Sequence, residues 1–355
     1  MTNRKTLILV AAFILLFAVL ALSQGGYRGL SVVVDRIEMI SESSIDQLLG
    51  KCIKYRVDTL YIPVVSFMEA LYDSDILPRS NVLINNGTPS GFDPLAYVME
   101  KGETFGIQII PLIDPVIVWP SKDIPMNALH VSNRHPDWLS RDSMGRLLTD
   151  PIILDPGAPA VQRFIISLVS EILRDYKPYQ IAFVNFEYPS PEYGHNPYAL
   201  KEFEQYRKDN RNRIVNLDTF RKEALDDLIK RLRATIESLG LSTRIFMFSL
   251  SQRDNALERH FQDWVYWINT GYVDWSVIWY WQPDRKNVAH DTQWALEHVL
   301  QEKVIPGFSP QSLQPSQYGV VLNTILSFPV SGVVVDTFQP GVLRILNDNK
   351  VGIPR

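Results

Sequence analysis

The chain has 355 residues, of which 46% are hydrophobic and 21% are charged. This composition excludes a disordered, collagen-like or disulfide-scaffold protein, and the length allows two domains or one large barrel. The 35 basic and 39 acidic residues give a net charge of −4, so no basic footprint indicates nucleic acid, and we expect no nucleic-acid partner.

The N-terminal residues carry the pattern of a targeting signal. Residues 7–22 form an uninterrupted apolar run that follows Arg4 and Lys5 and ends in Ala21-Leu22-Ser23. This layout predicts that residues 1–23 are a secretory signal peptide, or a membrane anchor that keeps both basic residues in the cytoplasm. We therefore expect an extracytoplasmic protein, either secreted or associated with the membrane through residues 7–22 and facing outward.

From Arg28 onward, short β-branched runs alternate with amphipathic segments, which is typical of a parallel sheet. The expected strands are Gly29–Asp35, Thr59–Ser66, Ile107–Asp114, Gln180–Glu187, Arg244–Ser251, Val273–Trp281, Lys303–Phe308 and Gly332–Thr337. Apolar residues at three and four spacing predict helices that include Ile45–Tyr55, Pro94–Phe105, Val161–Tyr176, Phe220–Leu239 and Trp264–Thr270. Eight strand–helix pairs predict an α/β fold, a (β/α)8 TIM barrel.

The predicted barrel occupies residues 28–355 as a single elaborated domain, since no linker or internal repeat divides the chain. Its connections after the third and fourth strands are long, about 40 and about 30 residues, and such loops gather at the carboxyl-terminal mouth, where barrel enzymes carry their sites.

Acidic residues follow several expected strands at this mouth. In the fourth strand, Asn185 and Glu187 share one face, and we expect the other face, with Ala182, Val184 and Phe186, to cover helices. By the same reasoning Asp35, Asp114 and Asp336 end the first, third and eighth strands. Converging carboxylates raise at least one pKa and supply a proton donor beside an ionised base or nucleophile, as glycoside hydrolysis requires. The catalytic candidates are Glu187, Asp336 and Asp114; each carboxylate could instead be a helix cap or half of an ion pair.

Aromatic residues indicate a sugar ligand, because the apolar faces of sugar rings stack on flat side chains while hydroxyls need polar partners. Trp279 and Trp281 share one face of the sixth strand, whereas Trp264, Trp267 and Trp294 fall at helical spacing and are expected to pack in the core. The candidate substrate-binding residues are Asn185, Asp35, Trp119, Tyr193, His195, Trp279, Tyr280 and Trp281.

Other chemistries lack their motifs. The six histidines include no His-Glu-x-x-His, and the chain has no Gly-x-Ser-x-Gly, P-loop or Gly-x-Gly-x-x-Gly. We therefore expect no metal site and no cofactor.

Several stretches together resemble the glycosyl-hydrolase-like family 10 proteins. The resemblance covers about Arg28 to Thr337 and is carried by the following segments: Ala70-Leu71-Tyr72, Gly91-Phe92-Asp93-Pro94-Leu95, His135-Pro136-Asp137-Trp138-Leu139, Gly145-Arg146, Leu154-Asp155-Pro156-Gly157, Tyr188-Pro189, Tyr193-Gly194, Gln262-Asp263-Trp264, Val273-Asp274 and Tyr280. It implies an eight-stranded barrel, a secreted or envelope location and a polysaccharide or glycan ligand.

The sequence departs from that family at the site. Members carry an Asp-Asp pair near the end of the fourth strand, where this chain has Val184 and Asn185, so that Glu187 is the only local carboxylate able to substitute. The family's Arg or Asp on the second strand is also missing, and the seventh strand does not end in the glutamate that many retaining barrel glycosidases use.

Three hypotheses remain open from the sequence. The first is a glycoside hydrolase of an extracytoplasmic or cell-envelope polysaccharide, with carboxylate general acid and base at the barrel mouth. In the second, the barrel has lost catalysis and binds glycan without cleaving it. The third is a structural envelope protein whose mouth is filled by its own loops.

Overall fold

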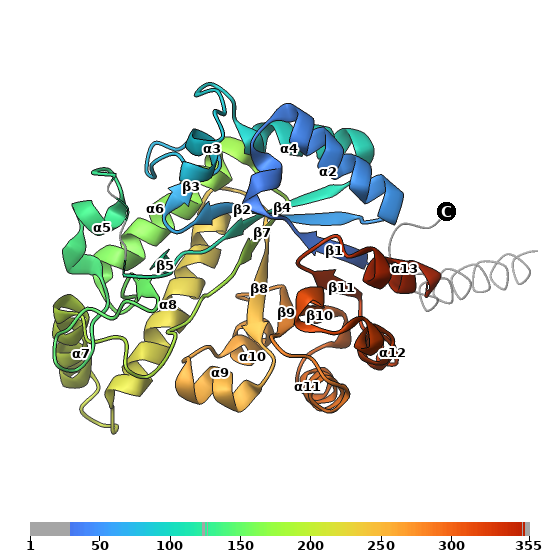
Figure 1. Cartoon of the computed structure of the whole chain (residues 1–355). Helices are drawn as coiled ribbons and strands as arrows, with labels where there is room; N and C mark the ends of the chain where they lie inside the picture. Colours follow the sequence, from blue (N-terminus) through green and yellow to red (C-terminus); the bar gives the residue numbers. More distant parts are fainter. Residues whose placement is uncertain (1–28, 123–124, 126, 350, 352–355) are drawn as a thin grey trace, which may run out of the picture.

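The computed structural model describes residues 29–122, 125, 127–349 and 351. Eight parallel strands form the centre of the molecule, with helices around them (Figure 1). The strands are β1 (Gly29–Val33), β2 (Thr59–Ser66), β4 (Gln108–Ile113), β7 (Gln180–Phe183), β8 (Arg244–Leu250), β9 (Trp275–Tyr280), β10 (Val304–Phe308) and β11 (Gly332–Val335). Pairing of β1 with both β11 and β2 closes the sheet, so the predicted TIM barrel is confirmed.

One helix of the outer layer follows each strand of the barrel. These helices are α2 (Glu42–Tyr55), α4 (Pro94–Phe105), α6 (Pro159–Tyr176), α8 (Leu217–Ser238), α10 (Trp264–Asn269), α11 (Arg285–His298), α12 (Tyr318–Leu326) and α13 (Pro340–Asp348). The first five coincide with the helices expected from apolar spacing. Their starts are fixed locally: in α4, Asp93 accepts hydrogen bonds from the amides of Leu95 and Ala96.

The loops at the mouth contain further short elements. The helices are α3 (Asn81–Asn85), α5 (Val131–Arg134), α7 (Pro197–Asp209) and α9 (Arg253–Arg259), with 3-10 turns η1 (Arg36–Met39), η2 (Pro136–Trp138), η4 (Pro310–Ser312) and η5 (Pro315–Gln317). A further 3-10 turn, η3 (Gln301–Lys303), precedes β10 at the amino-terminal end of the strands. Strand β3 (Glu69–Ala70) pairs antiparallel with the end of β2, and β5 (Ile117–Trp119) pairs with β6 (Ile152–Ile153). The two long predicted loops are thus partly structured and lie beside the barrel mouth.

The protein has two hydrophobic cores, one inside the barrel and one between the strands and the outer helices. The smaller core fills the barrel with side chains that include Tyr61, Leu112, Phe246, Phe248 and Val277. The larger core packs the outward faces of the strands against the helices and contains Trp264 and Trp267, as expected from their spacing. Because large side chains fill the interior, the barrel is a packed core and not a pore, and a barrel of this kind carries its site at the mouth.

Among the residues that the structure describes, no helix is both long enough and apolar enough to cross a membrane. The predicted signal or anchor, residues 1–23 with the apolar run 7–22, lies outside the described residues.

Candidate active site at the barrel mouth

A cavity of about 180 Å³ opens at the carboxyl ends of the barrel strands. It is bounded by an apolar floor and a polar and aromatic rim: Val33, Leu112, Val184, Asn185, Glu187, Phe248, Ser249, Leu250, Trp279, Trp281 and Asp336. We call it the central cavity. Five of the sequence candidates, namely Asn185, Glu187, Asp336, Trp279 and Trp281, therefore lie around one space.

The side chains at the end of β7 do not point in the directions expected from the sequence. Strand β7 ends at Phe183, and Asn185 adopts a left-handed conformation with φ of 54°. This conformation breaks the alternation of side chains. Ala182 and Val184, before this break, face the barrel interior, which corrects the expectation that they cover helices. The break at Asn185 is what brings Glu187 back to the cavity side. Phe186 packs outward as expected, and Phe183 does so too, with 5.6 Å between the two ring centroids.

Glu187 is held in a defined position at the cavity wall. The Gln262 side-chain amide donates a 2.8 Å hydrogen bond to Glu187 Oε2, while Gln262 Oε1 accepts from the amide of Leu250 at 3.0 Å. Gln262 thus connects the loop after α9 to the end of β8, and it fixes the position of one oxygen of Glu187.

Burial, together with the nearby charge of Asp114, raises the pKa of Glu187 to about 8. His260 lies 3.9 Å from Glu187 Oε1. Its Nδ1 is 3.0 Å from the Tyr188 carbonyl oxygen, and burial lowers its pKa, so the ring is neutral at pH 7 and does not offset the raised pKa of Glu187. Glu187 is therefore protonated at neutral pH, as a general acid must be.

Asp114 lies behind this wall rather than on it. Its Oδ1 accepts hydrogen bonds from the backbone amides of Val116 and Ile117, and its Oδ2 accepts one from the side-chain amide of Asn185 at 2.6 Å. Burial nevertheless raises the pKa of Asp114 to about 7, against the lowering effect of those hydrogen bonds. Both of its oxygens are engaged, so Asp114 holds Asn185 in its left-handed turn and raises the pKa of Glu187 through its charge.

Asp336 reaches the cavity from the end of β11. Its Oδ1 is buried, and among the described residues it has no hydrogen-bond partner. Burial raises the pKa of Asp336, an effect that a hydrogen bond from Ser309 opposes. An oxygen without a partner beside a cavity is free to accept a bond from a ligand or to react with one.

Trp279 and Trp281 form the aromatic side of the cavity. Their ring centroids are 6.4 Å apart with the planes at 73°, and Trp279 packs against Phe248 inside the barrel. Trp281 is 67% exposed at the rim. A large aromatic face left in solvent next to polar groups is a surface on which a sugar ring can stack.

The structure does not bring four other sequence candidates to the central cavity. Tyr280 points from β9 into the helix layer, where its hydroxyl is 2.8 Å from Thr292 Oγ1, because its side chain alternates with Trp279 and Trp281. Trp119, at the end of β5, packs on Phe67 and His130.

The other two belong to the loop after β7. The Tyr193 hydroxyl donates to the Pro151 carbonyl at 2.7 Å, and the His195 ring lies against Arg221, with 3.3 Å between Nδ1 and Nη2. Neither lines the cavity, so Tyr193 and His195 hold the loop together instead of facing the site.

Asp35, the last sequence candidate, caps η1 by accepting from the amide of Ile37 at 3.1 Å, and it lines a second hollow on the outer side of β1. Its role as a helix cap was one of the alternatives for the strand-end carboxylates.

Gln262 is the functional residue that sequence reasoning missed. It occurs in the Gln-Asp-Trp stretch that carries the family resemblance, but it is on no strand end and lies 75 positions from Glu187. Only the folded barrel brings the two together. Within residues 29–349, as far as they are described, no group of three or more His, Cys, Asp or Glu side chains could hold a metal ion.

The sequence is similar to curated glycosyl hydrolases. It is 24% identical over 215 residues to glycosyl hydrolase YngK of Bacillus subtilis (strain 168), which covers 59% of this chain and 39% of that protein. It is 26% identical over 194 residues to glycosyl hydrolase DigH of Escherichia coli (strain K12), covering 52% of this chain and 42% of that protein. The chain thus spans about two fifths of the length of these relatives.

Solved structures with a similar fold include the catalytic domain of the β-amylase from Paenibacillus polymyxa, with a TM-score of 0.57, 11% identity and coverage of 92% of this chain and 95% of that chain. The α-L-fucosidase isoenzyme 2 from Paenibacillus thiaminolyticus has a TM-score of 0.55 and 13% identity, covering 90% of this chain and 47% of that one. At these identities the likeness concerns the barrel fold alone.

The model of the family described as glycosyl hydrolase-like 10 matches residues 30–306, most of the chain and all of the barrel from β1 to within β10. This chain belongs to the glycosyl hydrolase-like 10 family.

Proposed function

We propose that the protein is a glycoside hydrolase that cleaves an extracytoplasmic or cell-envelope polysaccharide, with Glu187 as the general acid. The observation that carries this proposal is the position of Glu187. It is a carboxyl with a pKa raised to about 8, held by Gln262 on the wall of a cavity that also contains Asp336 and two tryptophans.

The proton on Glu187 passes to the glycosidic oxygen as the bond to the anomeric carbon breaks. Glu187 suits this step because its protonated form persists through neutral pH, while Gln262 fixes the other oxygen and so the direction of the proton. Loss of the proton above about pH 8 would end the step.

Asp336 is the better second carboxylate. It lines the cavity with a buried oxygen that has no partner in the described structure, whereas both oxygens of Asp114 are engaged by amides. Asp336 attacks the anomeric carbon directly or activates a water that does so, and water finally supplies hydrogen to the leaving oxygen and hydroxyl to the sugar. Asp114 raises the pKa of the acid without touching substrate.

Trp279 and Trp281 supply the stacking surface, and Asn185 supplies a polar contact in the same cavity. An extracytoplasmic location rests on the apolar run 7–22 with its basic flank, so the substrate is sought among envelope and secreted polysaccharides.

A second candidate function is glycan binding without cleavage. It is favoured by Asn185, which stands where the family resemblance implies an aspartate and whose side-chain amide donates its hydrogen bond to Asp114. In this case the aromatic surface binds sugar while the carboxylates have no chemical role.

The test is a panel of polysaccharides that includes peptidoglycan and acidic exopolysaccharides, assayed for new reducing ends. Wild type is compared with Glu187→Gln, Asp336→Asn and the control Glu192→Gln, which changes an exposed glutamate outside the cavity. Hydrolysis predicts release by wild type and the control, and a loss of about 10³-fold or more in the other two. Binding to the panel without release by wild type would establish the second function instead.

A further inference from the structure

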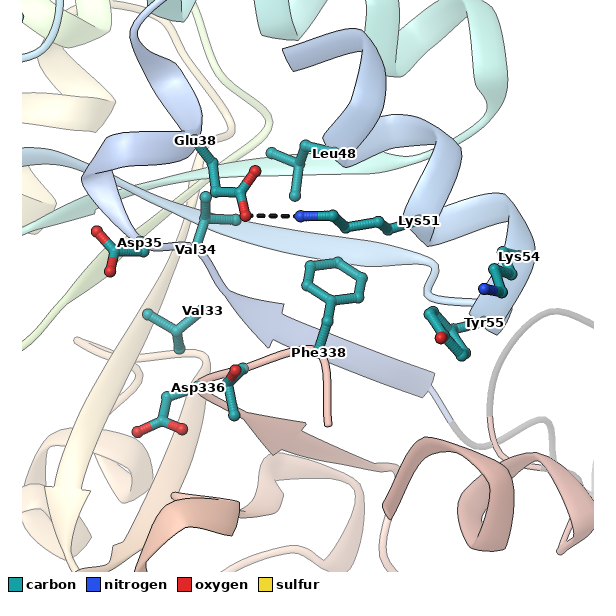
Figure 2. Close-up of a pocket in the computed structure, with 11 residues that line it drawn as sticks. Val33, Val34, Asp35, Glu38, Leu48, Lys51, Lys54, Tyr55, Asp336 and Phe338 are labelled. Atoms are coloured by element: carbon teal, nitrogen blue, oxygen red, sulfur yellow. Dashed lines mark hydrogen bonds and ion pairs between the residues drawn. The ribbon is translucent and has the colours of Figure 1, made fainter. Parts of the chain in front are cut away.

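A second hollow, which we call the flank groove, lies on the outer side of β1. It has a volume of about 380 Å³ and runs between η1, α2 and the segment after β11. Figure 2 shows Asp35, Val33 and Asp336 toward one end and Lys54 and Tyr55 at the other, with Phe338 between them. Of the residues that line this groove, the function proposed above uses only Asp336.

The flank groove adjoins the central cavity. Val33 and Asp336 line both spaces. The central cavity alone, at about 180 Å³, is smaller than the roughly 300–1,000 Å³ of ordinary ligand pockets, whereas the two spaces together fall within that range. Asp336 therefore stands at the boundary between two compartments of one larger site.

The groove combines aromatic faces with fixed polar groups. Phe338 and Tyr55 lie 6.4 Å apart between ring centroids, and Lys51 Nζ is 5.8 Å from the centroid of Phe338. Lys51 is itself held by Glu38 at 2.7 Å, and Lys54 Nζ lies 5.0 Å from the centroid of Tyr55. Partly buried aromatic rings with lysine ammonium groups over them and carboxylates in the same groove offer both apolar and polar contacts, which a pyranose ring needs for its C–H groups and its hydroxyls.

The charges of the groove favour a neutral ligand. Its described lining carries the carboxylates of Asp35, Glu38 and Asp336 and the ammonium groups of Lys51 and Lys54. Since Lys51 and Glu38 compensate each other, an anionic ligand would meet Asp35 and Asp336 with only Lys54 to attract it. A polyol offers hydroxyl donors to the carboxylates and acceptors to Lys54 without that repulsion.

We infer that the flank groove is a sugar subsite that takes a neutral pyranose unit adjoining the unit in the central cavity. The bound glycan then has at least two units and crosses Asp336, leaving the barrel between α2 and α13 rather than over β9. This inference rests on the proposed function and adds to it the direction and the minimum length of the substrate.

The test measures binding of neutral maltooligosaccharides, cellooligosaccharides and N-acetylglucosamine oligosaccharides, each from one to six units, by quenching of tryptophan fluorescence. Glu187→Gln is the parent protein, so that no ligand is cleaved. In the series that binds, we expect affinity to rise about tenfold or more from one unit to two. Phe338→Ala should remove most of that rise and leave the one-unit affinity unchanged.

Lys54→Ala is the second variant, because Lys54 is exposed and we expect its truncation to leave the fold intact. We expect it to remove part of the same rise. Tyr179→Ala, which truncates an aromatic residue that is 88% exposed away from both spaces, is the matched control and should match the parent. A rise that survives in both groove variants, or affinity already complete at one unit, would overturn the subsite while leaving the proposed hydrolase standing.

Two further outcomes separate the alternatives. Tight binding of polygalacturonic acid fragments that depends on Lys54, with no neutral series bound, would overturn the neutral assignment. Absence of binding by every glycan tested, neutral and acidic, would overturn the proposed function itself and the subsite with it.

Discussion

Replacement of Glu187 by glutamine should stabilise the folded protein at alkaline pH, independently of any substrate. The carboxyl has a pKa near 4.5 in the unfolded chain and about 8 in the folded protein. Between these values the unfolded chain releases a proton that the native state retains, so the free energy of unfolding of the wild type falls as pH rises. Below the lower value both states are protonated and the stability contributed by the neutral carboxyl is fully present.

The magnitude follows from the shift of the pKa. At 1.36 kcal/mol per unit, the shift corresponds to a loss of about 4–5 kcal/mol in the wild type by pH 9. Only 16% of the Glu187 side chain is exposed, so solvent screens little of this cost. Glutamine keeps an oxygen for the Gln262 amide and carries no charge, and Glu187→Gln avoids the loss at every pH.

Urea denaturation followed by tryptophan fluorescence at several pH values between about 4 and about 9 measures the effect. The difference in unfolding free energy between Glu187→Gln and wild type should be near zero at about pH 4 and grow to about 4 kcal/mol at about pH 9. Glu192→Gln, an exposed change nearby, should show no such growth. A difference that is constant across the pH range would refute the reasoning, because it would mean that Glu187 ionises in the folded protein as it does in water.

Three other predictions concern the surroundings of Glu187. Gln262→Ala should lower kcat about tenfold or more and shift the alkaline limb of the pH profile, because Gln262 holds Glu187. It should also cost about 1–3 kcal/mol of stability, because it removes the acceptor of the Leu250 amide. A drop in stability with an unmoved pH profile would contradict the positioning role. Trp281→Ala should weaken glycan binding about tenfold when it is measured by titration calorimetry. Its free energy of unfolding should stay within about 0.5 kcal/mol of the wild-type value, because the ring is exposed. Unaltered affinity would remove Trp281 from the site. Gly194→Ala should lower the free energy of unfolding in urea by more than about 2 kcal/mol, roughly twice the loss expected for Gly271→Ala. Both glycines have positive φ, but only at Gly194 would an added Cβ lie 2.5 Å from Arg221 Nε. Equal losses would contradict the steric argument.

The barrel could be predicted from the sequence because its signals are local. The β2 run Thr59–Ser66 is bounded by the residues expected, and α4 is marked at both ends, by the Asp93 cap and by Gly106 with φ of 66°. Side-chain alternation also placed Trp279 and Trp281 at the mouth and Asp336 beside them.

The site could be predicted only in part because its decisive features are non-local. Alternation fails after Phe183, where the left-handed turn at Asn185 depends on Asp114, 71 positions away in the chain. The same alternation that favours Trp279 and Trp281 turns Tyr280 outward. No periodicity reveals that Gln262 holds Glu187, because that contact exists only once β7 and β8 lie side by side.

Polysaccharide hydrolysis by the wild type and by Glu187→Gln, followed across pH, tests the central claim most directly. If Glu187 is the general acid, wild type releases new reducing ends from at least one envelope or secreted polysaccharide, and kcat falls as pH rises through about 8. Glu187→Gln then binds the same glycan with similar affinity and releases about 10³-fold less or nothing. Equal release by the two proteins would contradict the account.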